Sequence, residues 1–245
     1  MIYDFHSHVL PLMDDGAKSV EMSLTMWDES VKQGVDGVVA TSHCYPNSEK
    51  SIEKYLSGRR SSLAMISEAE GLPKLYMGCE VHLTGDLSRF SNIKKLCIEN
   101  TSYMLLEMPT SKWTDVTIDN VYKLTLLGIK PIIAHDERNM HQDTRLRNSL
   151  YELDVLIQIN APSLMLREYR RDIDRLFKMG MAHVIGTDMH NLTTRKPCME
   201  EARKIVVRRY GEKCWEYLMR NAERVISGVE IPYSDFIKFK KKGIF

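Results

Sequence analysis

The chain opens with MIYDFHSH (residues 1–8), a short apolar strand that ends on two histidines. His6 and His8 lie two positions apart, so their rings point to the same face of a strand. Two imidazoles at the end of a buried strand can form one half of a metal site. Histidines at this spacing are also common on protein surfaces, so the interpretation depends on what the rest of the chain places beside them.

Six further apolar segments have the length and composition of buried strands, and helical patterns separate them. Apolar strands that alternate with helices predict parallel strands covered on their outer side. Because no linker rich in Pro, Gly or Ser interrupts the series, we expect one α/β domain over residues 1–245, a closed or nearly closed barrel with a short basic tail at about 238–245. The expected strands after the first are 35–43, 75–83, 103–108, 130–135, 155–160 and 184–190, and the expected helices are 19–33, 48–70, 115–127, 144–152, 163–179, 200–210 and 215–227.

The composition limits the class of protein. With 43% hydrophobic residues the chain can bury a substantial core, and its formal net charge of +1 gives no overall field that favours nucleic acid. No apolar stretch is long enough to span a bilayer, and the N-terminus lacks the basic and apolar regions of a signal peptide. The five cysteines are scattered without a CxxC spacing, which suits a reducing compartment. We therefore expect a cytoplasmic protein.

Residues that can bind metal recur at or near the ends of six predicted strands. In a barrel these ends converge on one face, where such folds build their active sites. Glu107 follows the apolar run YMLL (residues 103–106), and a carboxylate buried there would be costly unless a cation accompanied it. Imidazole and carboxylate groups arriving from six strands indicate a polynuclear metal centre. The candidates are His6, His8, His43, Glu80, Glu107, His135, Asp188 and His190.

Six phrases of the sequence, taken together and in this order, resemble one known family. The chain is similar to the polymerase-and-histidinol-phosphatase (PHP) superfamily, whose fold is a distorted seven-stranded (β/α)7 TIM-like barrel. Within it, the chain resembles the bacterial manganese-dependent protein tyrosine phosphatases of capsule and exopolysaccharide gene clusters. The phrases are FHSHVLPLMDDG (5–16), VVATSHCYPN (38–47), LYMGCEVHL (75–83), YMLLEMP (103–109), IIAHDERN (132–139) and GTDMHNLTTRKP (186–197).

The resemblance implies two or three divalent metal ions, most often manganese, with iron or zinc as alternatives. Arg138 and Arg195 match the arginines that hold the phosphate in the family. Asp14 stands beside Asp15, so the assignment of that ligand stays open by one residue. The implied ligands are His6, His8, Glu80 and Asp188 for a first ion, Glu80 as a bridge with Glu107 and His135 for a second, and Asp15, His43 and His190 for a third.

The residue types also suit phosphate ester hydrolysis without the family name. A water molecule on such a metal can lose a proton near neutral pH and supply hydroxide to attack phosphorus. The planar fork of arginine fits phosphate oxygens, and a tyrosine leaving group departs more readily than a serine alkoxide. Cys214 and Arg220 have the C-x5-R spacing of cysteine-dependent phosphatases, but the bulky WEYLM between them (residues 215–219) cannot form a phosphate-binding loop.

Several functions remain open on the sequence alone. The resemblance implies a protein tyrosine phosphatase that acts on the phosphorylated tail of a membrane-associated bacterial kinase. The alternatives are a phosphoesterase for a small molecule such as histidinol phosphate, a metal-stabilised module that binds a phosphorylated tail without hydrolysis, and an amidohydrolase. Asp136 stands where an apolar residue or proline is expected and could perturb Arg138 or point to solvent. Trp113 could stack on a phosphotyrosine ring or simply be packed, and His183 is expected to be structural.

Overall fold

The computed structural model describes residues 1–69 and 71–241, and the strands in this part of the chain are all parallel. They form a three-stranded sheet in the order β1-β2-β4 and a six-stranded half-barrel in the order β3-β5-β6-β7-β8-β9. The strands are β1 (Tyr3–Ser7), β2 (Gly37–Ala40), β3 (His43–Cys44), β4 (Lys74–Met77), β5 (Glu80–His82), β6 (Tyr103–Glu107), β7 (Lys130–Ile133), β8 (Leu156–Asn160) and β9 (Val184–Gly186).

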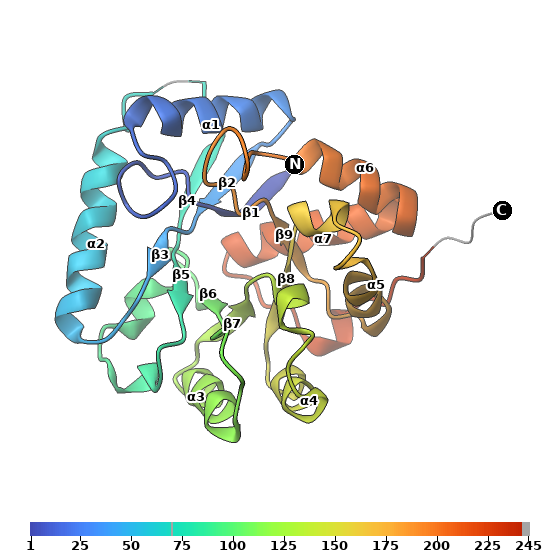
Figure 1. Cartoon of the computed structure of the whole chain (residues 1–245). Helices are drawn as coiled ribbons and strands as arrows, with labels where there is room; N and C mark the ends of the chain where they lie inside the picture. Colours follow the sequence, from blue (N-terminus) through green and yellow to red (C-terminus); the bar gives the residue numbers. More distant parts are fainter. Residues whose placement is uncertain (70, 242–245) are drawn as a thin grey trace.

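Helices surround the strands on the outside (Figure 1). Ser19 and Ser48 cap the N-termini of the first two helices, since their hydroxyls accept hydrogen bonds from backbone N–H groups of the first turn. None of the helices among the described residues is both long and apolar enough to cross a membrane. The helices are α1 (Val20–Lys32), α2 (Glu49–Ala64), α3 (Asp115–Leu126), α4 (Thr144–Glu152), α5 (Arg170–Met179), α6 (Met199–Tyr210) and α7 (Glu212–Ile226), with 3-10 turns at Leu87–Arg89, Ile93–Leu96, Asp136–Asn139, Pro162–Met165 and Tyr233–Asp235.

The α/β class and parallel strands are confirmed, but two of the predicted strands are each divided in two. The segment 35–43 forms β2 and then β3, which belongs to the other sheet, and the segment 75–83 forms β4 and β5 in the same way. The division falls at Thr41 and Ser42, where the Thr41 N–H bonds to the Ser7 carbonyl and both residues offer their carbonyls to Glu80 N–H. The chain therefore changes sheets just before each ligand-bearing segment.

Several other element boundaries differ from expectation. The strand expected at 130–135 ends at Ile133, and the helix expected at 215–227 begins at Glu212. The expected helix 48–70 ends at Ala64, and the expected helix 163–179 is a 3-10 turn followed by α5. The last predicted strand, 184–190, ends at Gly186, because Asp188 adopts a left-handed conformation (φ 53°) that leaves the strand. That departure carries the side chains of residues 188 and 190 away from the sheet.

The two sheets meet where β1 lies beside the end of β9. Ser7 and Met189 form an isolated parallel bridge, the His8 N–H donates to the Met189 carbonyl (2.9 Å), and the Asp188 N–H donates to the His6 carbonyl (2.7 Å). Gly186 permits this approach, because a Cβ at that position would collide with the backbone and Cβ of His6. The backbone thus places both His-x-His and Asp-x-His pairs at one seam between the sheets.

The C-terminal segment is anchored further along than the sequence suggested. In the expected tail from about residue 238, Lys238, Lys240 and Lys241 are exposed, but the Phe239 N–H donates to the Phe177 carbonyl (2.9 Å). Phe239 also packs on Tyr217, with ring centroids 5.4 Å apart. Residues 242–245 of the expected tail lie outside the described residues.

His183 is a buried residue whose protonation should oppose folding. Its Nδ1 accepts a hydrogen bond from the Ile157 N–H (2.8 Å), and burial lowers its pKa to about 3. An unfolded histidine titrates near pH 6.5, so the unfolded state binds more protons between pH 3 and 6.5 and stability falls as the pH falls through that window.

We expect protonation of His183 in the unfolded state to lower the free energy of unfolding by about 2 kcal/mol as the pH falls from 7 to 5. His183→Asn keeps an acceptor for Ile157 but cannot titrate, so its stability should fall by correspondingly less over the same range. Urea denaturation of both proteins at pH 7 and pH 5 measures the difference. Equal losses in the two proteins would contradict a neutral, buried His183.

Candidate metal centre

All nine residues predicted as metal ligands come together at the C-terminal ends of the strands. The ligand atoms form four sets, and within each set they lie within 4.8 Å of one another. Every set contains imidazole and carboxylate groups and none contains a thiol. In the part of the chain that the structure describes, the sets are His8, Asp15, His43 and His190; His6, Glu80 and His135; His6, His8 and Asp188; and His43, Glu80 and Glu107.

Glu80 lies at the middle of the centre with only 1% of the residue exposed. One carboxylate oxygen, Oε2, lies 3.3 Å from His6 Nε2 and 2.9 Å from His43 Nδ1. The other, Oε1, lies 2.8 Å from His135 Nε2. Its two oxygens therefore face different sets of ligands, as a carboxylate that bridges two cations must.

The structure separates the roles of the two neighbouring aspartates. Asp15 Oδ1 lies 3.3 Å from His190 Nε2 and 3.5 Å from His43 Nε2, so Asp15 belongs to the ligand set. Asp14 instead accepts hydrogen bonds from His8 Nδ1 and from the His43 N–H, both at 2.7 Å. Asp14 is therefore placed to orient imidazoles, and Asp15 is placed to bind.

Hydrogen bonds fix which nitrogen each histidine of the first strand presents. His6 Nδ1 bonds to Gln158 Oε1 (3.2 Å), which can only accept, and His8 Nδ1 bonds to Asp14 in the same manner. In the neutral form of each ring Nε2 then carries a lone pair, and the two Nε2 atoms face each other at 3.1 Å. Two lone pairs at that distance repel unless a cation lies between them and the carboxylates. Hydrogen bonds from the other ring nitrogen, such as those to Gln158 and Asp14, are usual for metal-bound histidines.

Gln158 is a residue of the candidate site that sequence reasoning missed. It accepts from the His135 N–H (2.8 Å) as well as from His6, so one amide orients two ligands. The sequence could have indicated Gln158, because it is the one strongly polar residue before the end of the apolar strand LIQIN (residues 156–160). A polar side chain inside such a strand requires a buried partner.

The ionisation states suit a divalent cation. Burial opposes ionisation of Glu80, but the neighbouring histidines, His6 foremost, outweigh burial and hold its pKa well below the usual range. The same balance, again led by His6, lowers the pKa of Asp188. Burial, with help from the charges of His8 and Arg195, lowers the pKa of His190 to about 4. At neutral pH the centre therefore offers two buried carboxylates and the neutral imidazole of His190. Burial opposes protonation of His6 and His8, but the neighbouring carboxylates raise the pKa of both rings, so a metal that binds there releases protons.

Among the residues that the structure describes, three buried polar atoms of the centre have no hydrogen-bond partner. They are Glu80 Oε2, His43 Nδ1 and His190 Nε2. Glu80 Oε2 and His43 Nδ1 are only 2.9 Å apart, but their directions do not form a hydrogen bond. Two ligand atoms of one cation can lie this close without a hydrogen bond, because the lone pair of each points at the ion. Unpaired polar groups in a buried site are costly, so the donor set fits a metal.

Both arginines predicted to hold phosphate converge on Asp188. Arg138 Nη2 lies 3.1 Å from one carboxylate oxygen, and Arg195 Nη2 lies 2.5 Å from the other. The two side chains are each 38% exposed, so they reach solvent above the centre. Both guanidinium groups therefore bond to Asp188, while the acids nearer to Arg138 in the sequence, Asp136 and Glu137, are buried.

Asp136 is buried and supports the turn that carries Arg138. Its carboxylate accepts hydrogen bonds from the Tyr151 hydroxyl (2.5 Å) and from the Asn139 side chain (3.1 Å). It therefore neither points to solvent nor contacts the Arg138 guanidinium. The unusual acid belongs to a local network that ties the Asp136–Asn139 turn to α4.

Trp113 cannot stack on a substrate ring as one interpretation allowed. Only 2% of the residue is exposed, and its indole N–H donates to the Pro109 carbonyl (2.9 Å). The exposed aromatic residue beside the centre is instead Tyr45, whose ring centroid lies 5.7 Å from that of His43. Sequence reasoning did not single it out.

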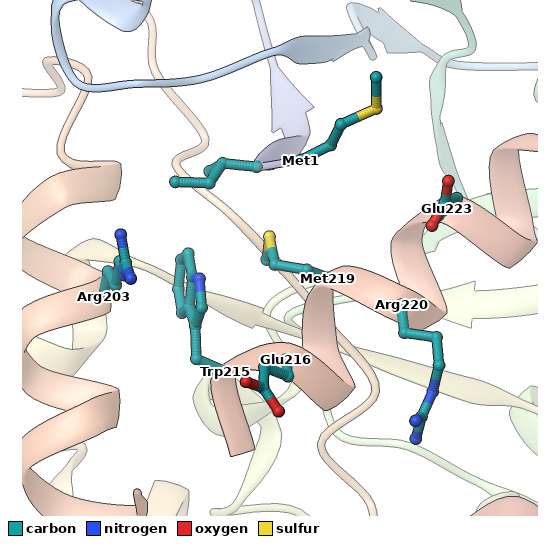
Figure 2. Close-up of a pocket in the computed structure, with 8 residues that line it drawn as sticks. Met1, Arg203, Trp215, Glu216, Met219, Arg220 and Glu223 are labelled. Atoms are coloured by element: carbon teal, nitrogen blue, oxygen red, sulfur yellow. The ribbon is translucent and has the colours of Figure 1, made fainter. Parts of the chain in front are cut away.

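Cys214 and Arg220 lie within α7 and away from the metal centre. Cys214 is fully buried, and burial raises its pKa to about 12, so it is not a nucleophile. Arg220 lines a separate pocket of about 410 Å³ between the start of β1 and helices α6 and α7, together with Met1, Trp215 and Glu223 (Figure 2). The structure thus agrees with rejecting a cysteine-dependent mechanism.

Removing Asp14 should weaken metal binding without abolishing it. Loss of a residue that orients a ligand typically costs about 10- to 100-fold in metal affinity, so we expect Asp14→Ala to fall in that range. Asp15→Ala should lose one class of bound ion altogether, whereas Asp28→Ala on exposed α1 should change nothing. Metal titration against a chromophoric chelator measures all three. A larger loss in Asp14→Ala than in Asp15→Ala would reverse the two roles.

Comparison with known proteins agrees with the resemblance drawn from the sequence. Residues 2–227 match the family described as "Capsular polysaccharide synthesis, CpsB/CapC". Tyrosine-protein phosphatase CpsB of Streptococcus agalactiae is 32% identical over 241 residues, covering 91% of this chain and 97% of the relative. Tyrosine-protein phosphatase YwqE of Bacillus subtilis is 28% identical over 233 residues, covering 91% of each.

A solved structure extends the comparison to three dimensions. It comes from work on YwqE from Bacillus subtilis and CpsB from Streptococcus pneumoniae, described as metal-dependent tyrosine phosphatases. The TM-score is 0.79 at 25% identity, and the match covers 98% of this chain and 100% of the other. The chain therefore belongs to the CpsB/CapC family of capsular polysaccharide synthesis proteins.

Proposed function

We propose that this protein is a metal-dependent tyrosine phosphatase that removes phosphate from phosphotyrosine in another protein. The observation that carries the proposal is the meeting of nine metal-binding side chains with two arginines at one open site. The relatives named tyrosine phosphatases cover nearly the whole chain and support the same activity.

The proposed ligands divide among two or three ions. The donor set of imidazole and carboxylate groups without thiolate favours manganese or iron over a structural zinc. When bound, such ions supply a nucleophile at neutral pH and stabilise charge on phosphoryl oxygens. We assign His6, His8, Glu80 and Asp188 to a first ion, Glu80 with Glu107 and His135 to a second, and Asp15, His43 and His190 to a third.

Arg138 and Arg195 are the proposed phosphate-binding residues. Their guanidinium groups approach Asp188 from two sides, and each can give up part of that contact to a phosphate oxygen. Arginine remains charged at every working pH and can bind two oxygens at once. The pair would neutralise phosphate charge that the ions leave exposed.

We propose that the substrate is a protein and not a metabolite, because the centre is open on one side. Asp15 and Tyr45 are 62% and 55% exposed, whereas a small-molecule site usually encloses its ligand. The partner that fits the family is the tyrosine-phosphorylated tail of a membrane-associated kinase, met in the cytoplasm. A module that only binds phosphate would not need the full ligand set.

The finer architecture also belongs to the proposal. Counting β2 with β3 and β4 with β5 as continuous strands gives seven, and the Ser7–Met189 bridge joins the two ends of the series. We propose that residues 1–245 form one domain of this kind, a distorted seven-stranded (β/α)7 barrel.

The activity is tested with manganese-loaded protein and two substrates. We expect hydrolysis of a phosphotyrosine peptide, and of a phosphorylated kinase tail, well above that of histidinol phosphate. Chelation should abolish the activity and added manganese should restore it, while Cys214→Ser should remain largely active. Preference for histidinol phosphate, or activity that survives chelation but not Cys214→Ser, would contradict the proposal.

A further inference from the structure

Tyr45 stands at the edge of the metal centre with its ring half exposed. It follows β3 directly, two residues after His43, and 55% of the residue is accessible. Its ring centroid lies 5.7 Å from that of His43 and 5.5 Å from that of His82. The ring is therefore bordered by the His43 imidazole of the centre and by His82 on one side, and by solvent on the other.

The backbone around Tyr45 is held in place on both sides. Cys44 before it is buried and pairs with Val81 in the parallel register of β3 and β5. Pro46 after it accepts a hydrogen bond from the Thr84 hydroxyl (2.6 Å), and a residue before proline is restricted to extended conformations. The backbone that carries the ring therefore loses little conformational freedom when a ligand packs on Tyr45.

Other aromatic side chains beside these strand ends are already engaged. Trp113 is buried, and the Tyr151 hydroxyl bonds to Asp136. The Tyr55 hydroxyl donates to the Ser42 carbonyl (2.9 Å) from beneath β3. Tyr45 is thus the aromatic residue whose ring is placed to meet an incoming molecule.

The ring of a bound aryl phosphate would lie at the edge of the metal centre where Tyr45 stands. One ester oxygen separates the phosphorus of phosphotyrosine from the ring, so a phosphate bound between the ligands and Arg138 leaves the ring close to the rim. Aromatic rings attract each other in offset or edge-to-face geometry at centroid distances of about 4.5–7 Å. Tyr45 already adopts comparable spacings with its two histidine neighbours.

We propose that Tyr45 determines specificity by packing its exposed ring face against the aromatic ring of the substrate. This inference rests on the proposed function and assigns the part of the site that selects aryl over alkyl phosphates. The ions and arginines bind the phosphate that both classes share, and Tyr45 contacts the ring that only one of them has.

The test uses binding, which does not depend on turnover. Phenylphosphonate and methylphosphonate carry the same anionic group and differ by the ring, and calorimetry with manganese-loaded protein gives the affinity of each. An aromatic pair corresponds to about a two- to twelvefold change in affinity. We expect Tyr45→Ala to lower the affinity for phenylphosphonate by that factor and to leave the affinity for methylphosphonate unchanged.

Two controls make the result specific. Tyr45→Phe keeps the ring and should bind both ligands like the parent, and Tyr122→Ala removes an exposed tyrosine from α3 and should do the same. Metal content of each variant should equal that of the parent. For phosphotyrosine peptide, the loss in Tyr45→Ala should appear as a higher KM.

Two outcomes would overturn the inference. Equal weakening of both phosphonates, or loss of metal in Tyr45→Ala, would mean that the ring only supports His43. No change in either affinity would mean that the substrate ring lies elsewhere. Neither outcome touches the proposed function, which fails separately if the metal-loaded parent hydrolyses no phosphotyrosine peptide.

Discussion

Glu80→Ala is expected to remove most of the bound metal and to lower turnover more than about a hundredfold. Residues that merely orient a ligand already account for about 10- to 100-fold in affinity, and Glu80 itself faces ligand sets on both sides. Its removal would also leave His6, His43 and His135 without the buried carboxylate that they surround. Metal analysis of the purified variant and its rate on phosphotyrosine peptide provide the two measurements.

A matched control separates this effect from loss of a surface charge. Glu99→Ala removes an exposed glutamate and should retain parent metal content and rate. Glu80→Gln keeps the shape of the side chain but not the charge, so it should resemble Glu80→Ala. A Glu80→Ala protein with full metal content and activity would show that Glu80 is not a bridge.

Arg138→Ala and Arg195→Ala should each lower turnover by about a hundred- to a thousandfold, the usual effect of removing a donor to a reacting oxyanion. Metal content and melting temperature should change little, because both side chains reach solvent above the centre. Lysine at either position should restore activity only in part, since a point charge cannot bind two phosphate oxygens as the guanidinium does. Steady-state kinetics on phosphotyrosine peptide measure these differences.

Arg145→Ala serves as the control, because Arg145 forms an exposed ion pair with Asp115 that contributes little. It should retain the parent rate and melting temperature. If both alanine variants of the phosphate-binding arginines also turn over at near the parent rate, the assigned phosphate site does not exist. If they lose metal instead, the arginines act by holding Asp188.

The parallel α/β arrangement could be predicted because each strand is a continuous apolar run. The division of 35–43 into β2 and β3 could not be predicted in this way, because VDGVVATSH continues without a Gly–Pro turn. The interruption falls where the Thr41 and Ser42 carbonyls accept from the N–H of distant Glu80, a contact that no local pattern encodes. The sequence therefore predicts that 35–43 is a strand, but it does not predict that β2 and β3 belong to different sheets.

The metal-binding side chains could be predicted because they stand at strand ends, where a parallel fold gathers them. The residues that orient them were harder to identify. Gln158 and Asp14 act through contacts 152 and 6 positions away, to His6 and His8, and a sequence does not reveal such pairs. Asp136 and Trp113 were noted, but their burial depends on tertiary packing.

The seam between β1 and β9 would couple metal binding at the proposed ligands to the stability of the fold. Backbone contact between the sheets there consists of a single bridge with flanking hydrogen bonds, and the ligand set His6, His8 and Asp188 spans it. Ions bound across the seam would add their binding free energy to that of folding, in proportion to the logarithm of their free concentration. Removal of metal would then lower the free energy of unfolding of the protein as well as its activity.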